Sequence, residues 1–475
     1  LGAFGTGCRR PEEKIYPFSK LPEGYTHGVA QHYATAMPNR GSAIPLVVKS
    51  HEGRPTKIEG NAQHPDSNGA TDTFAQASIL NLYDPDRAPR FTRRGNSILR
   101  EAPLAFLVQS AAQFAQNGGK GLCFLVERSS SPSRARLQNL IQQKYPQSRW
   151  VVYEPVDFDV HRQAASIAFG KPVAPYYKLD QANVIVSLDF DFVGGEEDSA
   201  RLIRGWAQKR KIAKPTDTMN RLYAVESLMT LSGANADHRL RVAPSQVLAG
   251  AAQLGAEIET LTGGAAGSKL AELGSAVKQH QKWIAECAKD LFSNKGKCLV
   301  VAGHRQPLAA HVIANKINAA LGNIGATVVF HEASQASETT ITEVAQDLKD
   351  GKVDALVILG GNPAYNAPAD LDWAKLQSKA KTVVRLGYYE DETFEAAKRA
   401  NDWHLQQAHY LESWGDARTS DGTVVPIQPL IEPLFGGVTE IEVLARLAGL
   451  DATKPHDIVR ETFKSLASGD FEPNW

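Results

Sequence analysis

Residues 354–363 read Asp-Ala-Leu-Val-Ile-Leu-Gly-Gly-Asn-Pro, an apolar strand followed by a tight turn. A run of consecutive apolar residues is typical of a strand that is covered on both faces, as in a parallel sheet. In the turn, Gly360, Gly361, Asn362 and Pro363 allow backbone N–H groups to approach a phosphate closely. The same residues also form an ordinary chain reversal. The stretch therefore predicts an α/β fold and leaves both interpretations of the turn open.

The pattern around this stretch is repeated earlier in the chain. Residues 184–188 form a similar apolar strand, 355 − 184 = 171 positions before its counterpart. Further strands are predicted at 121–127, 150–154, 222–226, 297–303, 327–330 and 382–386. Helical segments separate these strands, which predicts parallel sheets with helices on both faces. We therefore predict two doubly wound, Rossmann-like halves.

The composition and the positions of the cysteines exclude several classes of function. Lys plus Arg and Asp plus Glu are equal at 52 each among the 475 residues, which argues against a nucleic-acid or anionic-membrane surface. The length predicts about three domains. The cysteines stand at 8, 123, 287 and 298 without Cys-x-x-Cys spacing, so neither a disulfide framework nor a Cys-based metal site is expected. We interpret Cys123 and Cys298 as core thiols.

The N-terminus resembles the end of an export signal. Leu1–Gly7 is small and apolar, and it leads to Cys8 and an Arg-Arg-Pro run. Cys8 stands where a lipid-carrying cysteine stands in an exported lipoprotein, although Gly5 replaces the usual Leu three positions earlier. Lipid attachment at Cys8 and an uncleaved N-terminus are both compatible with this segment.

A second long stretch carries a family resemblance. Residues 45–69, Pro-Leu-Val-Val-Lys-Ser-His-Glu-Gly-Arg-Pro-Thr-Lys-Ile-Glu-Gly-Asn-Ala-Gln-His-Pro-Asp-Ser-Asn-Gly, resemble the N-terminal domain of molybdopterin oxidoreductases. In that family a Cys-x-x-Cys-x-x-x-Cys cluster precedes the stretch and a fourth cysteine follows it. Here residues 32–38 (His-Tyr-Ala-Thr-Ala-Met-Pro) and 69–72 (Gly-Ala-Thr-Asp) stand at these positions. No thiolate remains there to bind an iron–sulfur cluster.

The resemblance implies the molybdopterin-oxidoreductase fold of the DMSO reductase and formate dehydrogenase type, with domains I to III. Residues 1–90 are expected to form an export tail and a degenerate iron–sulfur-type domain I. Residues 91–147 and 295–475 are expected to form a Rossmann-like domain II, and residues 148–294 a Rossmann-like domain III.

In this family a guanine-dinucleotide pterin is held across the two halves. The Gly360–Pro363 turn matches the family's Gly-x-Asn-Pro dinucleotide turn, and we interpret it as vestigial. The equivalent turn of the other half, residues 189–197, reads Asp-Phe-Asp-Phe-Val-Gly-Gly-Glu-Glu, and its carboxylates would repel a pyrophosphate. A solvated acidic loop before a helix explains this turn equally simply.

The family also supplies a molybdenum ligand from a loop that matches residues 153–161. Apart from Tyr153 this loop offers no thiol or hydroxyl, and Asp157 and Asp159 are expected to be solvated. The densest polar loop, around His409 and Glu412, is either a former substrate loop or a hydrogen-bonded structural loop, and the structural interpretation is favoured. We therefore predict no catalytic residue and no metal ligand.

Three further groups of segments resemble the B-subunit family of alternative complex III. They are residues 219–227 with 230–240, residues 408–417 with 421–424 and 428–431, and residues 7–14. That family is molybdopterin-oxidoreductase-like, lacks the pterin and is exported by a Tat-type route. Its iron–sulfur clusters lie in a following C-terminal domain, whose cysteine motifs are absent from this sequence.

The resemblance implies a cofactor-free scaffold within a membrane-associated menaquinol:cytochrome c (or other high-potential acceptor) oxidoreductase of respiratory or photosynthetic electron transport. The expected partners are a multihaem cytochrome c and an integral membrane quinol-binding subunit, at the periplasmic face of a bacterial cytoplasmic membrane. An alternative is an active molybdopterin-dependent oxidoreductase that binds pterin near Gly360–Pro363. A third is an exported binding protein that uses the cleft between the halves.

Overall fold

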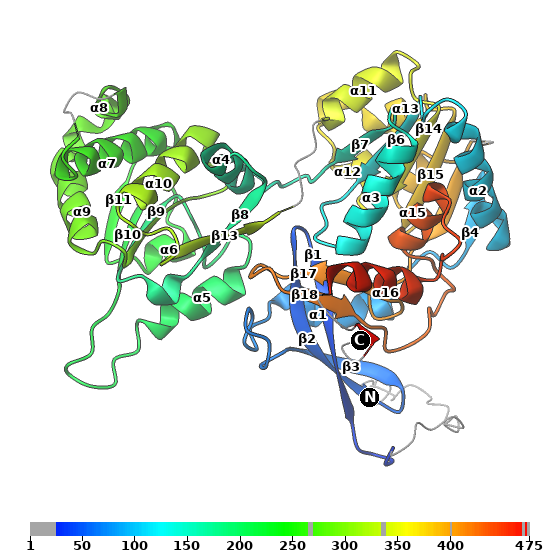
Figure 1. Ribbon diagram of the computed structural model, residues 1–475, viewed down its shortest axis with the longest axis horizontal. Coiled ribbons are helices and arrows are strands. Elements are labelled where there is room, and N and C mark those ends of the chain that lie inside the picture. Colours follow the sequence, from blue (N-terminus) through cyan, green and yellow to red (C-terminus); the bar gives the residue numbers. More distant parts are fainter. Residues whose placement is uncertain (1–24, 265–268, 334–338, 400, 468–470, 473–475) are drawn as a thin grey trace, which may run out of the picture.

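The computed structural model describes residues 25–264, 269–333, 339–399, 401–467 and 471–472. Within these residues the chain forms two α/β lobes beside each other and a smaller sheet region, which lies below them in Figure 1. We call these parts the seven-stranded lobe, the four-stranded lobe and the N-terminal sheet region.

The seven-stranded lobe has the strand order β5-β4-β16-β15-β14-β6-β7. Its strands are β4 (Phe91–Arg93), β5 (Asn96–Ile98), β6 (Leu122–Val126), β7 (Arg149–Val152), β14 (Ala355–Leu359), β15 (Thr382–Gly387) and β16 (Trp403–Gln406). The five strands from β16 to β7 are parallel. Its helices are α2 (Glu101–Ala115), α3 (Pro132–Lys144), α11 (Ile341–Lys349), α12 (Pro363–Asn366), α13 (Trp373–Gln377), α14 (Glu392–Glu395) and α15 (Glu440–Ala448). Apolar residues of α2, α3 and α15 cover one sheet face, and those of α11 and α13 cover the other.

The four-stranded lobe has the parallel order β11-β10-β9-β12. Its strands are β9 (Val184–Leu188), β10 (Arg221–Glu226), β11 (His238–Arg241) and β12 (Cys298–Ala302), and β8 (Val173–Tyr177) pairs separately with β13 (Val328–Glu332). Its helices are α4 (Val160–Phe169), α5 (Ser199–Gln208), α6 (Leu231–Ala234), α7 (Val247–Leu261), α8 (Lys269–Gly274), α9 (Gln281–Ser293) and α10 (Leu308–Ala320). Here too both faces of the sheet are covered by apolar side chains.

The two lobes repeat one arrangement of strands. The order β16-β15-β14-β6 in one lobe corresponds to β11-β10-β9-β12 in the other, and every pairing within both sets is parallel. The central strands β6, β9, β12 and β14 are buried along their whole length, as their continuous apolar sequences predict. The predicted pair of doubly wound halves is therefore confirmed.

The strand pairing corrects the predicted domain limits at three strands, β7, β12 and β13. Strand β7 follows the expected boundary at residue 148 but joins the seven-stranded sheet beside β6. Strand β12 was expected in domain II, which begins again at residue 295, but it pairs with β9 in the four-stranded sheet. The chain thus enters the four-stranded lobe after β7 and leaves it after β13, because hydrogen bonding between strands, not sequence order, decides which sheet a strand joins.

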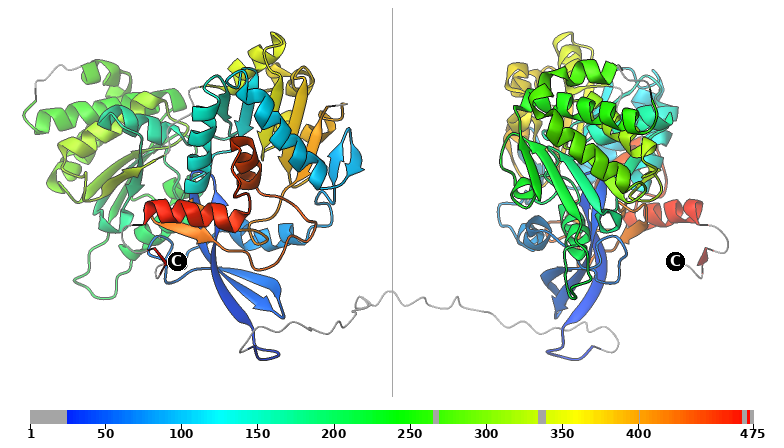
Figure 2. Two further views of the ribbon diagram at one scale, coloured as in Figure 1. Left: turned by 45° about the vertical axis from the view of Figure 1, so that its right-hand side comes forward. Right: turned by 90° about the vertical axis from the view of Figure 1, so that its left-hand side faces the viewer.

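The N-terminal sheet region contains an antiparallel hairpin over residues 42–60. Strands β1 (Gln31–Asn39), β2 (Ser42–His51) and β3 (Arg54–Gly60) form an antiparallel sheet, and helix α1 (Thr73–Leu82) packs on it. The hairpin of β17 (Gly415–Arg418) and β18 (Val424–Ile427) packs against this region, which Figure 2 shows from two sides. The N-terminal strands and this C-terminal hairpin therefore share an apolar cluster. Helix α16 (Pro455–Leu466) contacts β17, and its Ile458 and Val459 belong to the core of the seven-stranded lobe.

Candidate functional site

Each lobe has one position where its fold favours a ligand. In open parallel sheets, ligands bind beyond the carboxyl ends of two adjacent strands from which the chain continues in opposite directions. In the seven-stranded lobe these strands are β14 and β6, because β15 lies beyond β14 and β7 lies beyond β6. In the four-stranded lobe they are β9 and β12. We call these two positions the β14/β6 crevice and the β9/β12 crevice.

The β14/β6 crevice contains the predicted Gly360–Pro363 turn. Gly360 and Gly361 have φ angles of +77° and +64°, which glycine adopts without strain. The carboxylate of Glu127, the residue directly after β6, lies against both glycines, and a Cβ at Gly360 would overlap its Oε2. The backbone of Gly361 also lowers the pKa of the Glu127 carboxyl, which agrees with this close approach. A carboxylate of the chain itself therefore fills the space that the two glycines leave.

Arg385 on β15 binds the carbonyl groups of the same turn. Its guanidinium donates to the carbonyl oxygen of Gly360 at 2.6 Å, to that of Gly361 and to Asp391 Oδ2 at 2.8 Å. Arg385 is almost completely buried. Partial desolvation raises the pKa of the Glu127 carboxyl, and the charge of Arg385 opposes this. The turn is thus fixed by protein groups on both sides.

The Asn362 side chain is also hydrogen-bonded within the lobe. Its Nδ2 donates to Glu392 Oε2 at 2.7 Å, and its Oδ1 accepts hydrogen bonds from the backbone and hydroxyl of Thr393 at 3.2 and 2.7 Å. These bonds join the turn to helix α14. Asn362 is therefore a structural residue of the turn.

The N-terminus of α3, which follows β6, also holds an internal carboxylate. Asp416, at 4% exposure, accepts the backbone N–H of Ser133 at 3.1 Å and the hydroxyls of Ser131 and Ser133. Helix N-termini favour anions through their free N–H groups and their dipole. Burial raises the pKa of Asp416, and the bonds from the two serines oppose that shift. Asp416 thus takes the place that a phosphate often takes at such a helix.

In the β9/β12 crevice the corresponding carboxylate belongs to Glu196 from the acidic turn 189–197. Its Oε1 accepts the backbone N–H of His304 at 3.0 Å and lies 2.9 Å from Nδ1 of the same residue, while Nε2 of His161 lies 3.4 Å from Oε2. Burial by itself would raise the pKa of Glu196, but the bonds and charges from the two histidines lower it to about 2. Glu196 is therefore a buried anion.

The remaining carboxylates of this turn also have partners. Asp191 accepts hydrogen bonds from the backbone and hydroxyl of Ser232 at 3.0 and 2.8 Å, and Asp189 accepts one from Gln306 at 2.9 Å. The interpretation of the turn as a solvated acidic loop is therefore wrong for Glu196, Asp189 and Asp191. The sequence suggested a solvated loop because the groups that donate hydrogen bonds to these carboxylates lie far from them in the sequence.

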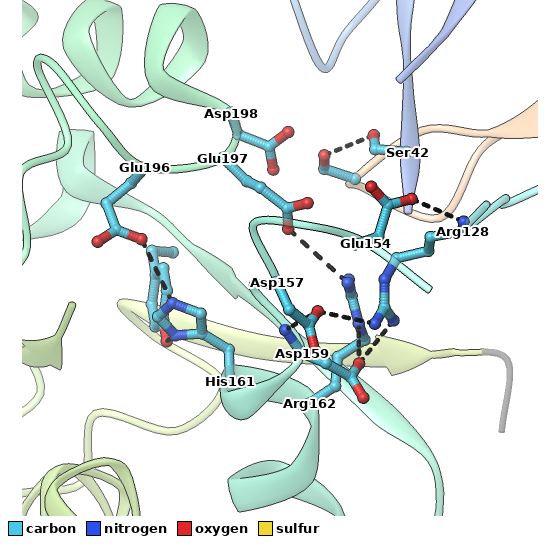
Figure 3. A network of polar contacts seen from close by, with 12 residues as sticks. Ser42, Arg128, Glu154, Asp157, Asp159, His161, Arg162, Glu196, Glu197 and Asp198 are labelled. Carbon is cyan, nitrogen blue, oxygen red and sulfur yellow. Dashed lines mark hydrogen bonds and ion pairs between the residues drawn. The ribbon is translucent and has the colours of Figure 1, made fainter. Parts of the chain in front are cut away.

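Residues 153–161, which match the loop that supplies the metal ligand in the family, lead from β7 to α4 and so join the two lobes. Figure 3 shows the charged side chains of this segment and their partners. Arg128 donates to Asp159 at 2.6 Å and to Asp157 at 3.0 Å. Arg162 donates to Asp159 at 2.9 Å and lies 3.8 Å from Glu197. Among the described residues, no group of three or more His, Cys, Asp or Glu side chains is arranged to hold a metal ion. Asp157 and Asp159 are both ion-pair partners of arginine, but only Asp159 is buried, so the interpretation as solvated is wrong for Asp159 and holds for the exposed Asp157.

The polar loop around His409 is a buried structural element. Glu412 is paired with Arg87 through two hydrogen bonds of 3.0 and 2.7 Å and accepts the backbone N–H groups of His409 and Leu434. Burial lowers the pKa of His409 to about 4. Tyr410 hydrogen-bonds to Ser78 on α1 at 2.7 Å. These contacts agree with the favoured structural interpretation of this loop.

The segments expected to have lost an iron–sulfur cluster lie in the N-terminal sheet region. Residues 32–38 belong to β1, and Asp72 accepts the backbone N–H of Ala75 and so caps helix α1. Cys123, Cys287 and Cys298 are free and buried in the lobes, far from this region in the sequence. Burial raises the pKa of Cys123 to about 12 and that of Cys298 to about 11. Both are core thiols, as predicted, whereas Cys8 lies outside the described residues.

A cavity of about 480 Å³ lies away from both crevices, between the N-terminal sheet region and the four-stranded lobe. Asp66, Tyr176, Lys178, Arg201 and Arg204 line part of it. Asp66 is buried 3.4 Å from Arg201, and its burial raises its pKa to about 7, with Asp198 adding to the shift and Arg201 opposing it. No residue that the sequence predicted as a site lines this cavity.

The structure has the fold of the molybdopterin oxidoreductases, as predicted. It is similar to acetylene hydratase from Pelobacter acetylenicus, with a TM-score of 0.63 and 12% identity, over 88% of this chain and 70% of that chain. At this identity the likeness concerns the fold alone. No protein-family model and no curated protein matches the sequence.

The residues in the two crevices do not fit a dinucleotide pterin. A pyrophosphate needs free N–H donors, but the Glu127 carboxylate lies against the glycine turn and Glu196 accepts the N–H of His304. Two carboxylates at these points also repel phosphate.

Within the described residues, no helix is long and apolar enough to span a bilayer.

Proposed function

We propose that this chain is a cofactor-free scaffold within a membrane-associated quinol-oxidising complex of the alternative complex III type. In this proposal it performs no redox chemistry itself and serves to hold neighbouring subunits. Electrons would pass from menaquinol to a periplasmic cytochrome c or another high-potential acceptor through those subunits. Iron–sulfur clusters would belong to a C-terminal domain outside this sequence.

The observation that carries the cofactor-free part is the pair of glutamates at the two crevices. Glu196 is a buried anion held by His304 and His161, and Glu127 fills the glycine turn. Both stand where the fold would otherwise present donors to the cofactor. The absence of thiolates from residues 32–38 and 69–72 supports the same conclusion for the iron–sulfur cluster of domain I.

The partner and location parts of the proposal rest on the resemblance of the long segments to the B-subunit family. The proposed partners are a multihaem cytochrome c and an integral membrane quinol-binding subunit. We place the chain at the periplasmic face of a bacterial cytoplasmic membrane after Tat-type export, with Cys8 as the proposed site of lipid attachment.

Elemental analysis and pterin fluorescence on the purified chain test the cofactor-free part. We expect molybdenum, tungsten, iron and pterin to be far below one equivalent per chain. Stoichiometric molybdenum or tungsten with pterin would contradict the proposal and favour an active oxidoreductase that uses the Gly360–Pro363 turn. The partner part is tested by isolating the chain from solubilised membranes, where co-isolated c-type haem absorbance is expected and its absence would contradict that part.

A further inference from the structure

In each crevice, a glutamate that follows one central strand reaches the backbone that follows the other central strand. The strand that precedes the glutamate is not the equivalent one in the two lobes. In the four-stranded lobe, Glu196 follows β9 and binds the N–H of His304, the second residue after β12. In the seven-stranded lobe, Glu127 follows β6 and lies against the backbone of Gly361, the second residue after β14. Because β9 corresponds to β14 and β12 to β6, each carboxylate crosses from one central strand to the other.

A glycine makes room for the carboxylate in each case. A Cβ at Gly360 would overlap Glu127 Oε2. A Cβ at Gly303 would lie 3.1 Å from Glu196 Oε1 and would overlap the carbonyl oxygen of Asp189. In phosphate-binding turns glycine serves the same purpose, since it lets the ligand approach the backbone.

Basic side chains lie beside both carboxylates. Arg385 interacts with Glu127 by charge and holds the carbonyl groups of the glycine turn. His161 and His304 surround Glu196. A backbone turn with glycine and a nearby basic side chain together form the ordinary surroundings of a bound phosphate.

We propose that Glu127 and Glu196 are built-in anions that replace bound phosphate groups in the two crevices. Removal of the Glu127 carboxylate should therefore uncover a site for a diphosphate at the Gly360–Gly361 turn. Glu127 is the better of the two for a test, because its side chain is solvent-accessible whereas Glu196 is buried. The inference rests on the cofactor-free part of the proposed function and not on the partners.

The experiment measures melting temperature against inorganic pyrophosphate for four proteins at constant ionic strength. They are the wild type, Glu127→Ala, Glu127→Gln and Glu154→Ala. Glu127→Gln keeps the volume and a carbonyl acceptor beside Gly361. Glu154 is the matched control because it stands near Glu127 and accepts the backbone N–H of Arg128 at 2.7 Å, away from the glycine turn.

We expect only Glu127→Ala to show a saturable rise in melting temperature of about 2 °C or more. No rise in folded Glu127→Ala, or an equal rise in the wild type, would overturn the proposal. An equal rise in Glu154→Ala would overturn it too, because the gain would then reflect lost negative charge and not an uncovered site.

If Glu127→Ala does not fold alone, its refolding yield with and without pyrophosphate gives the second measurement. Recovery by pyrophosphate supports the proposal and lack of recovery overturns it. Failure of the inference is distinguishable from failure of the proposed function, because the latter is read from metal and pterin in the wild type.

Discussion

Glu196 illustrates how single side chains determine the chemistry of a crevice. A buried carboxylate without partners tends to be protonated, because the low dielectric disfavours its charge. Here His304 lies 2.9 Å from one oxygen and His161 lies 3.4 Å from the other. Their hydrogen bonds and charges outweigh the desolvation and keep Glu196 ionised.

This arrangement predicts a pH-dependent stability. The pKa of Glu196 in the folded chain, about 2, lies below its ordinary value of 4.5, so the unfolded chain takes up a proton first. The stabilisation is complete above about pH 4.5 and is lost as the pH falls toward 2, with a total of about 3 kcal/mol. We expect Glu196→Gln to lower the free energy of unfolding by about this amount at pH 7.

Urea unfolding followed by circular dichroism checks this prediction. Near pH 3 the difference between the wild type and Glu196→Gln should shrink to less than half its value at pH 7. Glu286→Gln serves as a control, since Glu286 pairs with Lys289 on the surface and should change stability little at either pH. A difference that does not vary with pH would contradict the assignment.

For single residues, the sequence predicts where a turn lies better than it predicts which side chains the turn contacts. The Gly360–Pro363 turn could be found because glycines directly follow an apolar run. Its partners Glu127 and Arg385 were missed, because they are distant in the sequence and become neighbours only in the sheet. The available signal was a charge at the end of, or within, an otherwise buried strand, since such a charge needs a specific partner.

Among the secondary-structure elements, the ends of β9 and β12 form the tightest approach in the β9/β12 crevice. Gly303 follows β12, and its backbone N–H donates to the carbonyl of Leu188 at 2.9 Å. A side chain there would overlap the backbone of Asp189. Two strand ends can therefore meet here only if one of them carries glycine.

We predict that Gly303→Ala destabilises the protein by about 3 kcal/mol, because a backbone segment must move to admit the methyl group. The control is Gly415→Ala, where the added Cβ would have only ordinary contacts of 3.7 Å and more. Its effect should stay within about 1 kcal/mol. Thermal unfolding of both variants gives the comparison, and equal effects would contradict the steric argument.

Element prediction succeeded where strands are apolar throughout and failed where they are not. The central strands β9 and β14 were found because both of their faces are buried. Strand β8 was missed because it contains Pro175, which usually argues against a strand, and β1 because most of its residues remain partly exposed. β12 was found but expected in the wrong lobe, since its apolar sequence fits either sheet.

Over the whole molecule, the junction of the lobes depends on a network of charges. Arg128 of the seven-stranded lobe binds Asp157 and Asp159, and Arg162 on α4 joins Asp159 and Glu197 (Figure 3). The tip of the β1–β2 hairpin adds Arg40, whose guanidinium lies 4.8 Å from the centre of the Phe158 ring. All three parts of the molecule therefore meet at the start of α4.

We predict that Arg128→Ala loosens this junction. Loss of two charge-assisted hydrogen bonds should speed limited proteolysis within residues 153–159 about tenfold, without preventing either lobe from folding. Arg90→Ala removes an ion pair with Glu390 at the surface and should leave the cleavage rate nearly unchanged. Mass spectrometry of the fragments identifies the cut, and equal rates in the two variants would contradict the prediction.

The insertion of the four-stranded lobe between β7 and β14 also governs the order in which the protein forms during translation. β6 needs β14 as its neighbour, yet 355 − 152 − 1 = 202 residues separate the end of β7 from the start of β14. At about 5–20 residues per second, a ribosome needs about 10–40 s to make them. The inserted lobe is complete within that interval, whereas β6 waits with one open edge that other chains can pair with. Biogenesis must therefore shield this edge until β14 emerges.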